Sequence, residues 1–495
     1  MRKYYFFILL FFPMFSIAQI IPITSTEPLD LSVYGEATTY PGEGEYEVFL
    51  SADNILDKPI ILVDGFDPGD TRDISGLYSL LDYAESSGTQ NLADLVRAEG
   101  FDVVVLNFPT YTRDIDAITV DGGADFMERN AMVLVKLIEI INAEKAANSP
   151  EQNVIIGPST GGIIARYALN YMENTSIDAD TRLYISFDSP HHGANVPIGL
   201  QHQLNWLAFN NTNPVAEVQP LINGLLKSPA ARQLLTDHLD THLSGADLVT
   251  FDPLLTLPQA HPFRGFFETN INSLTPSGFP ENIRNVAIIN GSGISNPYFA
   301  IGNSGPTVDN EYPVIDTNFS VPVSVFTANI SLAINLTPAA GDTNPVSSIS
   351  IQIFGAEIDG SLAESESFSY SDGIDAAPGG LFDLAGLTAG LGASGVAGDF
   401  VNALTIDKFS FIPSVSALAL EITDNEIDWH HTIDLAGRAT TNNTPFDNTF
   451  LPDDNEPHVQ LNEANVAFVL SEILTPTLSI YDNNLFAFRL EKNPI

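Results

Sequence analysis

Residues 153–169 read NVIIGPSTGGIIARYAL, and this stretch decides the fold. Its first residues, Asn153 to Gly157, form an apolar run of strand length, and the residues from Gly161 onward have the apolar spacing of a helix. Between the two lies GPSTG, which matches the pattern G-x-S-x-G. A serine at such a sharp turn from strand to helix presents its Oγ outside the sheet, and small neighbours let the backbone pack closely. Ser159 is therefore the candidate nucleophile, and an ordinary glycine turn is the alternative.

Strand-length apolar runs alternate with helical patterns from Glu45 to Ser292. The longest expected helix covers Asp125 to Ala147, and another covers Gly161 to Met172. The expected strands are Tyr46 to Ser51, Pro59 to Asp64, Asp102 to Asn107, Asn153 to Gly157, Arg182 to Phe187 and Asn285 to Ile289. This alternation predicts an α/β fold with a mostly parallel central sheet flanked by helices.

The pattern of apolar and polar residues in the sequence changes after Ser292. Two stretches, Ser320 to Leu336 and Val346 to Ile358, alternate apolar with polar or small residues, as the strands of hairpins do. A Gly-rich and nearly uncharged stretch follows from Pro378 to Gly398. We expect residues 293–403 to form a β-rich insertion that serves as a cap or lid. A separate binding domain is the alternative.

This insertion would divide the core into two parts, residues 19–292 and residues 404–475. The second part is expected to resume at the apolar segment Phe409 to Leu420 and to end with the helix Glu463 to Ile473. Residues 476–495 would form a tail.

The first 18 residues, MRKYYFFILLFFPMFSIA, carry two basic residues, then an apolar run, then small residues. This order is typical of a signal peptide that is removed on export. The apolar run is shorter than the roughly 20 residues that a membrane-spanning helix needs. We therefore expect a secreted protein without stable membrane insertion.

The chain is strongly acidic and has no cysteine. It contains 62 Asp and Glu against 19 Lys and Arg, for a formal net charge of −43. Nucleic acid is therefore not an expected partner, because phosphate binding depends on Lys and Arg. The absence of cysteine excludes disulfides, so the fold must depend on its apolar core.

An acyl-transfer site also needs backbone N–H groups that stabilise the negative oxygen of the tetrahedral intermediate. Thr160 follows the candidate nucleophile and is the first expected donor. The second should come from the loop after an earlier strand, and the strand in IILVDGFDPGD ends at Asp64-Gly65-Phe66. We therefore expect Phe66 to be the second donor. An ordinary turn at Gly65 is the alternative.

Three segments resemble the lipase-like α/β hydrolases, which include secreted bacterial lipases and esterases: DGF at residues 64–66, GPSTGGIIARYAL at residues 157–169 and SPHHGA at residues 189–194. The resemblance implies the α/β-hydrolase fold and a lipase or carboxylesterase that cleaves an ester or lipid substrate without a cofactor or metal. Asp64 stands where many of these lipases have His, and Pro158 replaces the commoner His or Tyr. A polyester depolymerase with the same triad and a non-catalytic extracellular binding or adhesion protein remain alternatives. At the C-terminus, FAFRLEKNPI resembles the opening of a bacterial secretion sorting module.

The predicted general base is His458. In this fold the nucleophile, the acid and the histidine follow one another along the chain, and the histidine lies beyond the final core strand. His458 lies in a polar loop that leads directly into an amphipathic helix, from which its ring can reach Ser159. His430 and His431 lie in the same part of the chain, and His431 is the rival.

The predicted acid is Asp375, in the polar loop SDGIDAAPGG, with Asp407 and Asp447 as rivals. It would orient the imidazole of the general base. A zinc site built on Asp188, His191 and His192 is a competing hypothesis for the SPHHGA segment. Adjacent histidines on one loop rarely point at the same ion, so no metal is expected.

Overall fold

A computed structural model of the chain describes residues 19–212, 214–245, 247–323, 326–384, 395–420, 431 and 444–475. The expected signal peptide, the histidine at position 430 and the expected tail lie outside these residues. No helix in the described part of the chain is long and apolar enough to cross a membrane.

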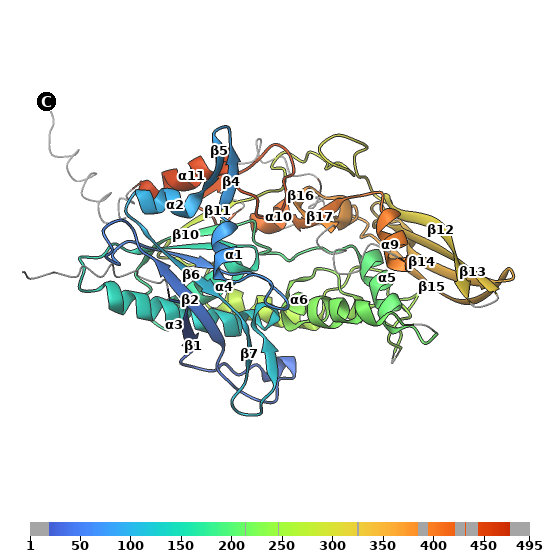
Figure 1. The fold of residues 1–495 in the computed structure, drawn as a ribbon, viewed down its shortest axis with the longest axis horizontal. Helices are drawn as coiled ribbons and strands as arrows, with labels where there is room; N and C mark the ends of the chain where they lie inside the picture. The colour runs from blue at the N-terminus through green and yellow to red at the C-terminus, as the bar shows by residue number, and fades with distance from the viewer. Residues whose placement is uncertain are drawn as a thin grey trace, which may run out of the picture.

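An eight-stranded sheet forms the centre of the structure (Figure 1). Its spatial order is β1 (Ile21–Thr24), β2 (Glu43–Phe49), β6 (Asp102–Asn107), β3 (Pro59–Val63), β9 (Asn153–Pro158), β10 (Thr181–Phe187), β11 (Arg284–Ile288) and β18 (Asn448–Phe450). The strands from β6 to β18 pair in parallel, whereas β1 and β2 add an antiparallel edge. The sheet contains all six strands that the sequence predicts, so the predicted mostly parallel sheet is confirmed.

The central sheet buries apolar side chains on both faces, because successive residues of a strand point to opposite sides. On β3, Ile61 and Val63 belong to one apolar core, whereas Ile60 and Leu62 belong to another. Figure 1 shows a group of helices on each side of the sheet. The first core is covered by α3 (Met127–Lys145) and α4 (Thr160–Asn174), and the second by α1 (Ile74–Ser79), α2 (Leu92–Ala98) and α11 (Glu463–Leu474).

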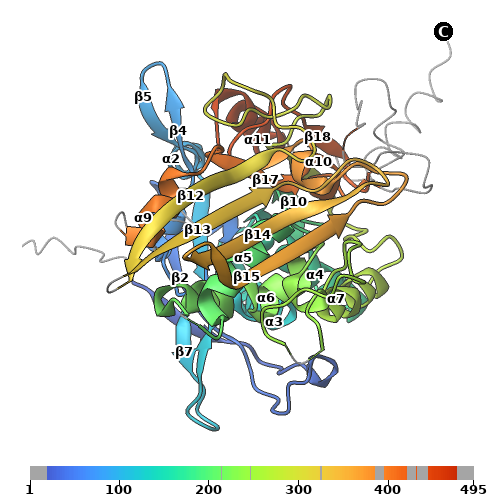
Figure 2. The same ribbon diagram turned by 90° about the vertical axis from the view of Figure 1, so that its right-hand side faces the viewer.

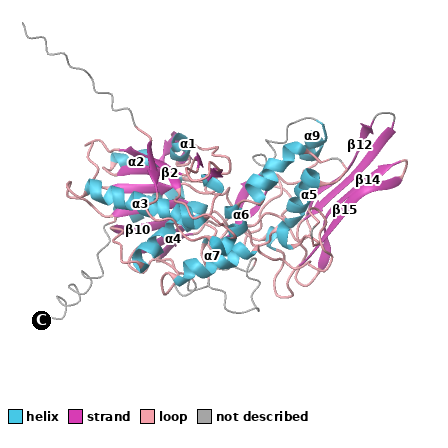
Figure 3. Ribbon diagram, turned by 90° about the horizontal axis from the view of Figure 1, so that it is seen from below, coloured by secondary structure: helices cyan, strands magenta, loops and turns pink. Residues whose placement is uncertain are grey.

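A four-stranded antiparallel sheet lies at one end of the molecule, away from the central sheet (Figures 1 and 3), and Figure 2 shows it face-on. It is formed by β12 (Pro313–Val323), β13 (Phe326–Asn335), β14 (Thr343–Ile353) and β15 (Ala356–Glu366), where the sequence predicts hairpin strands. Leu332 and Ile334 of β13 share an apolar cluster with Leu200 and Trp206 of α5 (Ile198–Phe209). Because α5 follows β10 in the chain, this end of the molecule draws on two separate segments.

The apolar segment at which the second part of the core was expected to resume lies outside the central sheet. The segment at Phe409 supplies no strand to the central sheet: β17 (Lys408–Pro413) pairs with β16 (Gly379–Asp383) in a separate two-stranded sheet. Phe409 packs in the same cluster as β13 and α5, while Ile412 packs in the core around α3 and α4. Burial on both sides explains why β17 has the apolar composition of a core strand. The strand that closes the central sheet is β18 instead.

Several further helices and hairpins surround these sheets. They are a π-helical turn (Leu221–Leu226), α6 (Pro229–Leu234), α7 (Pro262–Ser273), α9 (Gly395–Asn402), α10 (Ser414–Ala417) and the hairpins β4 (Asp82–Glu85) with β5 (Gly88–Asn91) and β7 (Thr110–Thr112) with β8 (Thr119–Asp121).

The start of α3 is fixed by a buried ion pair. The Arg129 guanidinium lies 2.6 Å from Asp125 and 2.7 Å from Glu36, and it stacks 3.7 Å from the centre of the Tyr40 ring. The side chains of Arg129 and Asp125 are only 3% and 5% exposed. Removing one partner of such a pair leaves the other charge buried without compensation.

We expect Arg129→Met to lower the free energy of unfolding by about 3–5 kcal/mol, because Asp125 would stay buried without its partner. Urea denaturation followed by circular dichroism measures this loss. Lys136→Met on the same helix is the control, since Lys136 pairs with Glu139 at the surface. The control should change stability by no more than about 0.5 kcal/mol. Equal stability of the two variants would contradict the prediction.

Candidate active site

Ser159 lies at the turn between β9 and α4 in a backbone conformation that serine rarely adopts. Its φ is 54° and its ψ is −133°. The turn is held by hydrogen bonds from the Ser159 amide to the Phe187 carbonyl (2.8 Å) and from the Gly162 amide to the Ser159 carbonyl (3.1 Å). Strained backbone of this kind persists where the surrounding structure fixes it, and it occurs often at active sites. The turn has the geometry expected of a nucleophile between strand and helix.

Close backbone packing explains the glycines around Ser159. A Cβ atom on Gly161 would lie 2.3 Å from the carbonyl oxygen of Val63, at the end of β3. A Cβ atom on Gly157 would lie 2.4 Å from the Cα of Gly162. Both contacts are with backbone, which cannot move aside cheaply. The first turn of α4 therefore reaches the end of β3 only because these residues lack side chains.

His458 reaches Ser159 from the loop between β18 and α11, as the sequence predicts. Its Nε2 lies 2.8 Å from Ser159 Oγ. Its backbone amide donates to the Leu381 carbonyl of β16 (2.8 Å), and its ring packs edge-on against Phe411 of β17, with ring centres 5.1 Å apart. The side chain is 11% exposed. The ring is thus positioned by the two-stranded sheet of β16 and β17 as well as by its own loop.

Asp188 occupies the other side of the imidazole. Its Oδ2 lies 2.7 Å from His458 Nδ1, and its Oδ1 accepts a hydrogen bond from the Asn290 amide (3.0 Å). The carboxylate is fully buried. A Cβ atom on Gly380 of β16 would lie 1.9 Å from Asp188 Oδ2, so β16 closes over the carboxylate. Ser159, Asp188 and His458 form one hydrogen-bonded series in the chain order that this fold uses.

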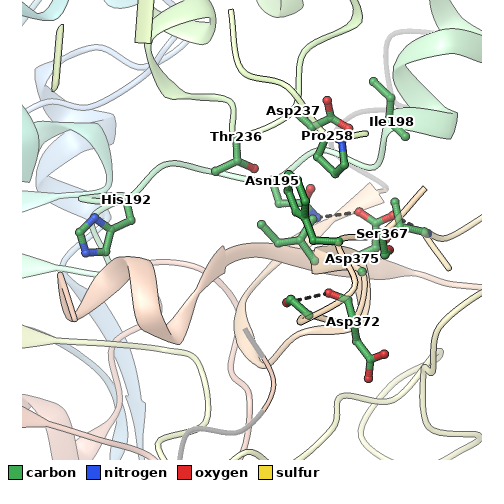
Figure 4. A pocket seen from close by; sticks show the side chains of 14 residues that line it. His192, Asn195, Ile198, Thr236, Asp237, Pro258, Ser367, Asp372 and Asp375 are labelled. Atoms are coloured by element: carbon green, nitrogen blue, oxygen red, sulfur yellow. Dashed lines mark hydrogen bonds between the residues drawn. The ribbon is translucent and has the colours of Figure 1, made fainter. Parts of the chain in front are cut away.

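The structure does not bring Asp375 to His458, and this corrects the predicted acid. Asp375 is buried elsewhere, where it accepts hydrogen bonds from the Asn195 side chain and the Thr337 amide, both at 2.9 Å. It lines a cavity of about 140 Å³ (Figure 4), whose lining includes none of the three residues of the series. Burial raises the pKa of its carboxyl.

The rival residues also lie away from Ser159. Asp407 accepts from the Gly302 amide and Asp447 from the Asn285 amide, both at 2.8 Å. His431 Nε2 lies 2.8 Å from the Gly373 carbonyl oxygen. Each of these three side chains is thus held by a backbone group of a distant segment and not by the residues around Ser159.

The sequence contained a signal for Asp188 that composition alone does not reveal. Asp188 directly follows β10, which pairs in parallel with β9, the strand that ends just before Ser159. Carboxyl ends of neighbouring parallel strands meet at one edge of the sheet, so a carboxylate there is already close to the nucleophile. Asp375, the predicted acid, lies instead in a polar loop that is nearer to the histidine in the sequence.

The three residues of the competing zinc hypothesis point to different partners. Asp188 binds His458, His191 Nε2 lies 2.8 Å from Ser186 Oγ, and His192 Nε2 lies 2.9 Å from the Leu420 carbonyl oxygen. Burial lowers the pKa of His192 to about 4, with Arg264 adding to the shift. Among the described residues, no group of three or more His, Cys, Asp or Glu side chains could hold a metal ion.

The two predicted oxyanion donors lie beside the nucleophile. Thr160 is the first residue of α4, where the helix dipole favours negative charge. The loop of Phe66 packs against the same turn, since a Cβ atom on Gly65 would lie 3.3 Å from the Cβ of Ser159. Within the described part of the chain, neither the Thr160 nor the Phe66 amide donates a hydrogen bond to another protein group. Both are free to bind an oxyanion.

Asp64 and Arg72 hold the loop of Phe66. Asp64 Oδ1 accepts from the Gly65 amide (2.7 Å) and from Arg72 Nη2 (3.1 Å). Arg72 Nη2 also donates to the Phe66 carbonyl (3.0 Å). Burial raises the pKa of the Asp64 carboxyl to about 7, and the Arg72 charge opposes this shift. The residue that departs from the lipase pattern therefore supports the predicted donor.

Comparison with known proteins agrees with this architecture. Residues 58–219 match the family model described as a PGAP1-like alpha/beta domain. The matched region contains Ser159 and Asp188, whereas His458 lies beyond it. Comparison with curated proteins finds no match. Together with the sheet order, the family match shows the predicted α/β-hydrolase fold, with extra β-sheets outside the central one.

Several solved structures are similar to this chain at low identity. An α/β serine hydrolase of Xanthomonas campestris is 15% identical over 36% of this chain and 64% of its own, with a TM-score of 0.22. A peroxisomal α/β-hydrolase of Saccharomyces cerevisiae is 16% identical over 55% of this chain and 73% of its own, with a TM-score of 0.28. A Pyrobaculum calidifontis esterase is 11% identical over 55% and 66%, with a TM-score of 0.25.

We expect Asp64→Asn to change how stability depends on pH. The folded carboxyl keeps its proton up to a pH of about 7, whereas the unfolded one loses it near its ordinary pKa of about 4. The stabilisation from Asp64 is therefore full below about pH 4 and is lost as the pH rises through about 7. The free energy of unfolding of the wild type, relative to Asp64→Asn, should fall across this interval.

Urea denaturation at a series of pH values measures this difference. At about pH 5.5, unfolding of the wild type should release about one proton more than unfolding of Asp64→Asn. Asp114→Asn, at an exposed carboxylate, should follow the wild type. A constant difference between wild type and Asp64→Asn from pH 4 to pH 8 would refute the assignment.

Proposed function

We propose that this protein is a secreted serine hydrolase that cleaves carboxylic esters through an acyl-enzyme on Ser159. The observation that carries the proposal is the hydrogen-bonded series from Ser159 Oγ to His458 Nε2 (2.8 Å) and from His458 Nδ1 to Asp188 Oδ2 (2.7 Å). The α/β-hydrolase fold is consistent with ester hydrolysis in general. The assignment of roles rests on the geometry of this chain.

Acylation would begin with attack of Ser159 Oγ on the ester carbonyl carbon. His458 Nε2 takes the hydroxyl proton as the new C–O bond forms, and Asp188 stabilises the resulting imidazolium through Nδ1–H. The carbonyl oxygen becomes an oxyanion, which the Thr160 and Phe66 amides can bind. Collapse of the intermediate breaks the bond to the alcohol, and His458 returns the proton to the departing oxygen.

Deacylation would repeat these steps with water. His458 removes a proton from the water molecule as its oxygen attacks the acyl carbon, and the same amides stabilise the second oxyanion. The proton then returns to Ser159 Oγ when the C–O bond to the enzyme breaks, and the carboxylic acid leaves. No group outside the described residues is needed to balance either half-reaction.

Asp188 suits the role of the acid because it is fully buried and held on both oxygens. The Asn290 amide fixes Oδ1, which leaves Oδ2 directed at His458. A carboxylate fixed in this way keeps the imidazole in the tautomer that presents an unprotonated Nε2 to the serine. Secretion is part of the proposal and is supported by the signal-like residues at positions 1–18.

We expect Ser159→Ala and His458→Ala each to lower kcat on a soluble p-nitrophenyl ester by about 10⁴-fold or more, since members of a triad act as one unit. Labelling by a fluorophosphonate probe should disappear in Ser159→Ala. Turnover that survives Ser159→Ala, with the fold intact by circular dichroism, would end the proposal.

The acid is tested by a pair of matched variants. Asp188→Asn should lower kcat by about 10⁴-fold, because the amide favours the wrong imidazole tautomer. Asp375→Asn should retain kcat within a few-fold, measured per folded molecule, and His431→Ala should behave likewise. A large loss of kcat in Asp375→Asn, with kcat retained in Asp188→Asn, would instead assign the acid to Asp375.

A further inference from the structure

An apolar cavity of about 320 Å³ adjoins the candidate active site. Sixteen residues line it, and only Asp67 and Thr71 among them are polar. These two are hydrogen-bonded to each other, and Asp67 also accepts from the Arg72 amide (2.8 Å). The cavity therefore offers a ligand apolar contact and almost no polar partner, so a sugar, phosphate or glycerol group does not fit its chemistry.

Two residues that line the cavity also belong to the surroundings of the candidate active site. Phe66, whose amide is a predicted oxyanion donor, is one of its walls. Phe411 is another, and its ring packs edge-on against His458. An ester carbonyl held between Ser159 and the Phe66 amide would thus lie at the edge of an apolar space.

We propose that this cavity binds the acyl chain of the substrate and that the π-helical turn Leu221–Leu226 sets the chain length it accepts. The inference rests on the proposed ester hydrolysis at Ser159 and specifies its substrate as an ester of a medium-length, uncharged fatty acid. The cavity has the volume of about ten water molecules at roughly 30 Å³ each, which suits a chain of medium length.

The π-helical turn limits the length of the acyl chain because three of its residues line the cavity: Leu221, Leu225 and Leu226. Its wider winding is visible in the hydrogen bond from the Lys227 amide to the Ile222 carbonyl (2.7 Å), five residues back. π-helical turns are rare and occur frequently at functional sites. Leu225 is only half-buried, so replacing it alters the cavity without opening the main core.

The test measures kcat/KM of the full-length protein on p-nitrophenyl esters from acetyl to palmitoyl. For the wild type we expect a rise of about fourfold per added methylene, up to chains of medium length, and a plateau or fall beyond. Leu225→Trp should move the optimum to shorter chains and Leu225→Ala to longer ones. Leu470→Trp is the matched control, because Leu470 is a half-buried leucine on α11, on the other face of the sheet, and it should keep the wild-type profile.

A second series keeps the acetyl group and lengthens the alkyl alcohol. In this series the dependence of kcat/KM on alcohol length should be the same in the wild type and in both Leu225 variants. Unchanged acyl profiles in both Leu225 variants, or a Leu225 effect on the alcohol series alone, would overturn the acyl assignment. Fluorophosphonate labelling of Ser159 distinguishes failure of this inference from failure of the proposed function. Labelling together with unchanged acyl-chain profiles rejects this inference only. No labelling of the folded protein rejects the proposed function as well.

Discussion

The contact between the first turn of α4 and the end of β3 is the constraint on which the site depends. Gly161 touches the Val63 carbonyl so closely that a methyl group could not fit between them. This approach fixes the strained turn at Ser159 and also brings the loop of Phe66 against it. The proposed nucleophile and the proposed oxyanion donors are thus positioned by close backbone packing at glycine. Such rigid support is what preorganised catalysis requires.

The strand β16 supports the other half of the site, which consists of His458 and Asp188. Leu381 accepts from the His458 amide and donates to the Glu456 carbonyl (2.9 Å), so the histidine loop is paired to β16 on both sides. The neighbouring Gly380 lies against Asp188, where a side chain would displace the carboxylate. A strand outside the central sheet therefore determines how the imidazole and the carboxylate meet.

Much of this arrangement could be predicted from local sequence. Ser159 and Thr160 are fixed by a turn whose requirements are visible in five residues, and His458 stands out as a polar residue just before an amphipathic helix. Asp188 was missed because its role depends on which strands are neighbours, and pairing between β9 and β10 is not a local property. The pairing of β17 with β16 is not a local property either, because a strand buried between two clusters has the same apolar composition as one buried in a central sheet.

The position of β16 also bears on where the chain can change in length. In the sequence, β16 lies far from the loop of His458 and from Asp188. In space, however, it supplies the carbonyl that holds the histidine and the glycine that admits the carboxylate. An insertion or deletion that shifted β16 by one residue would therefore move both contacts at once, so this segment lacks the freedom of length that surface loops have.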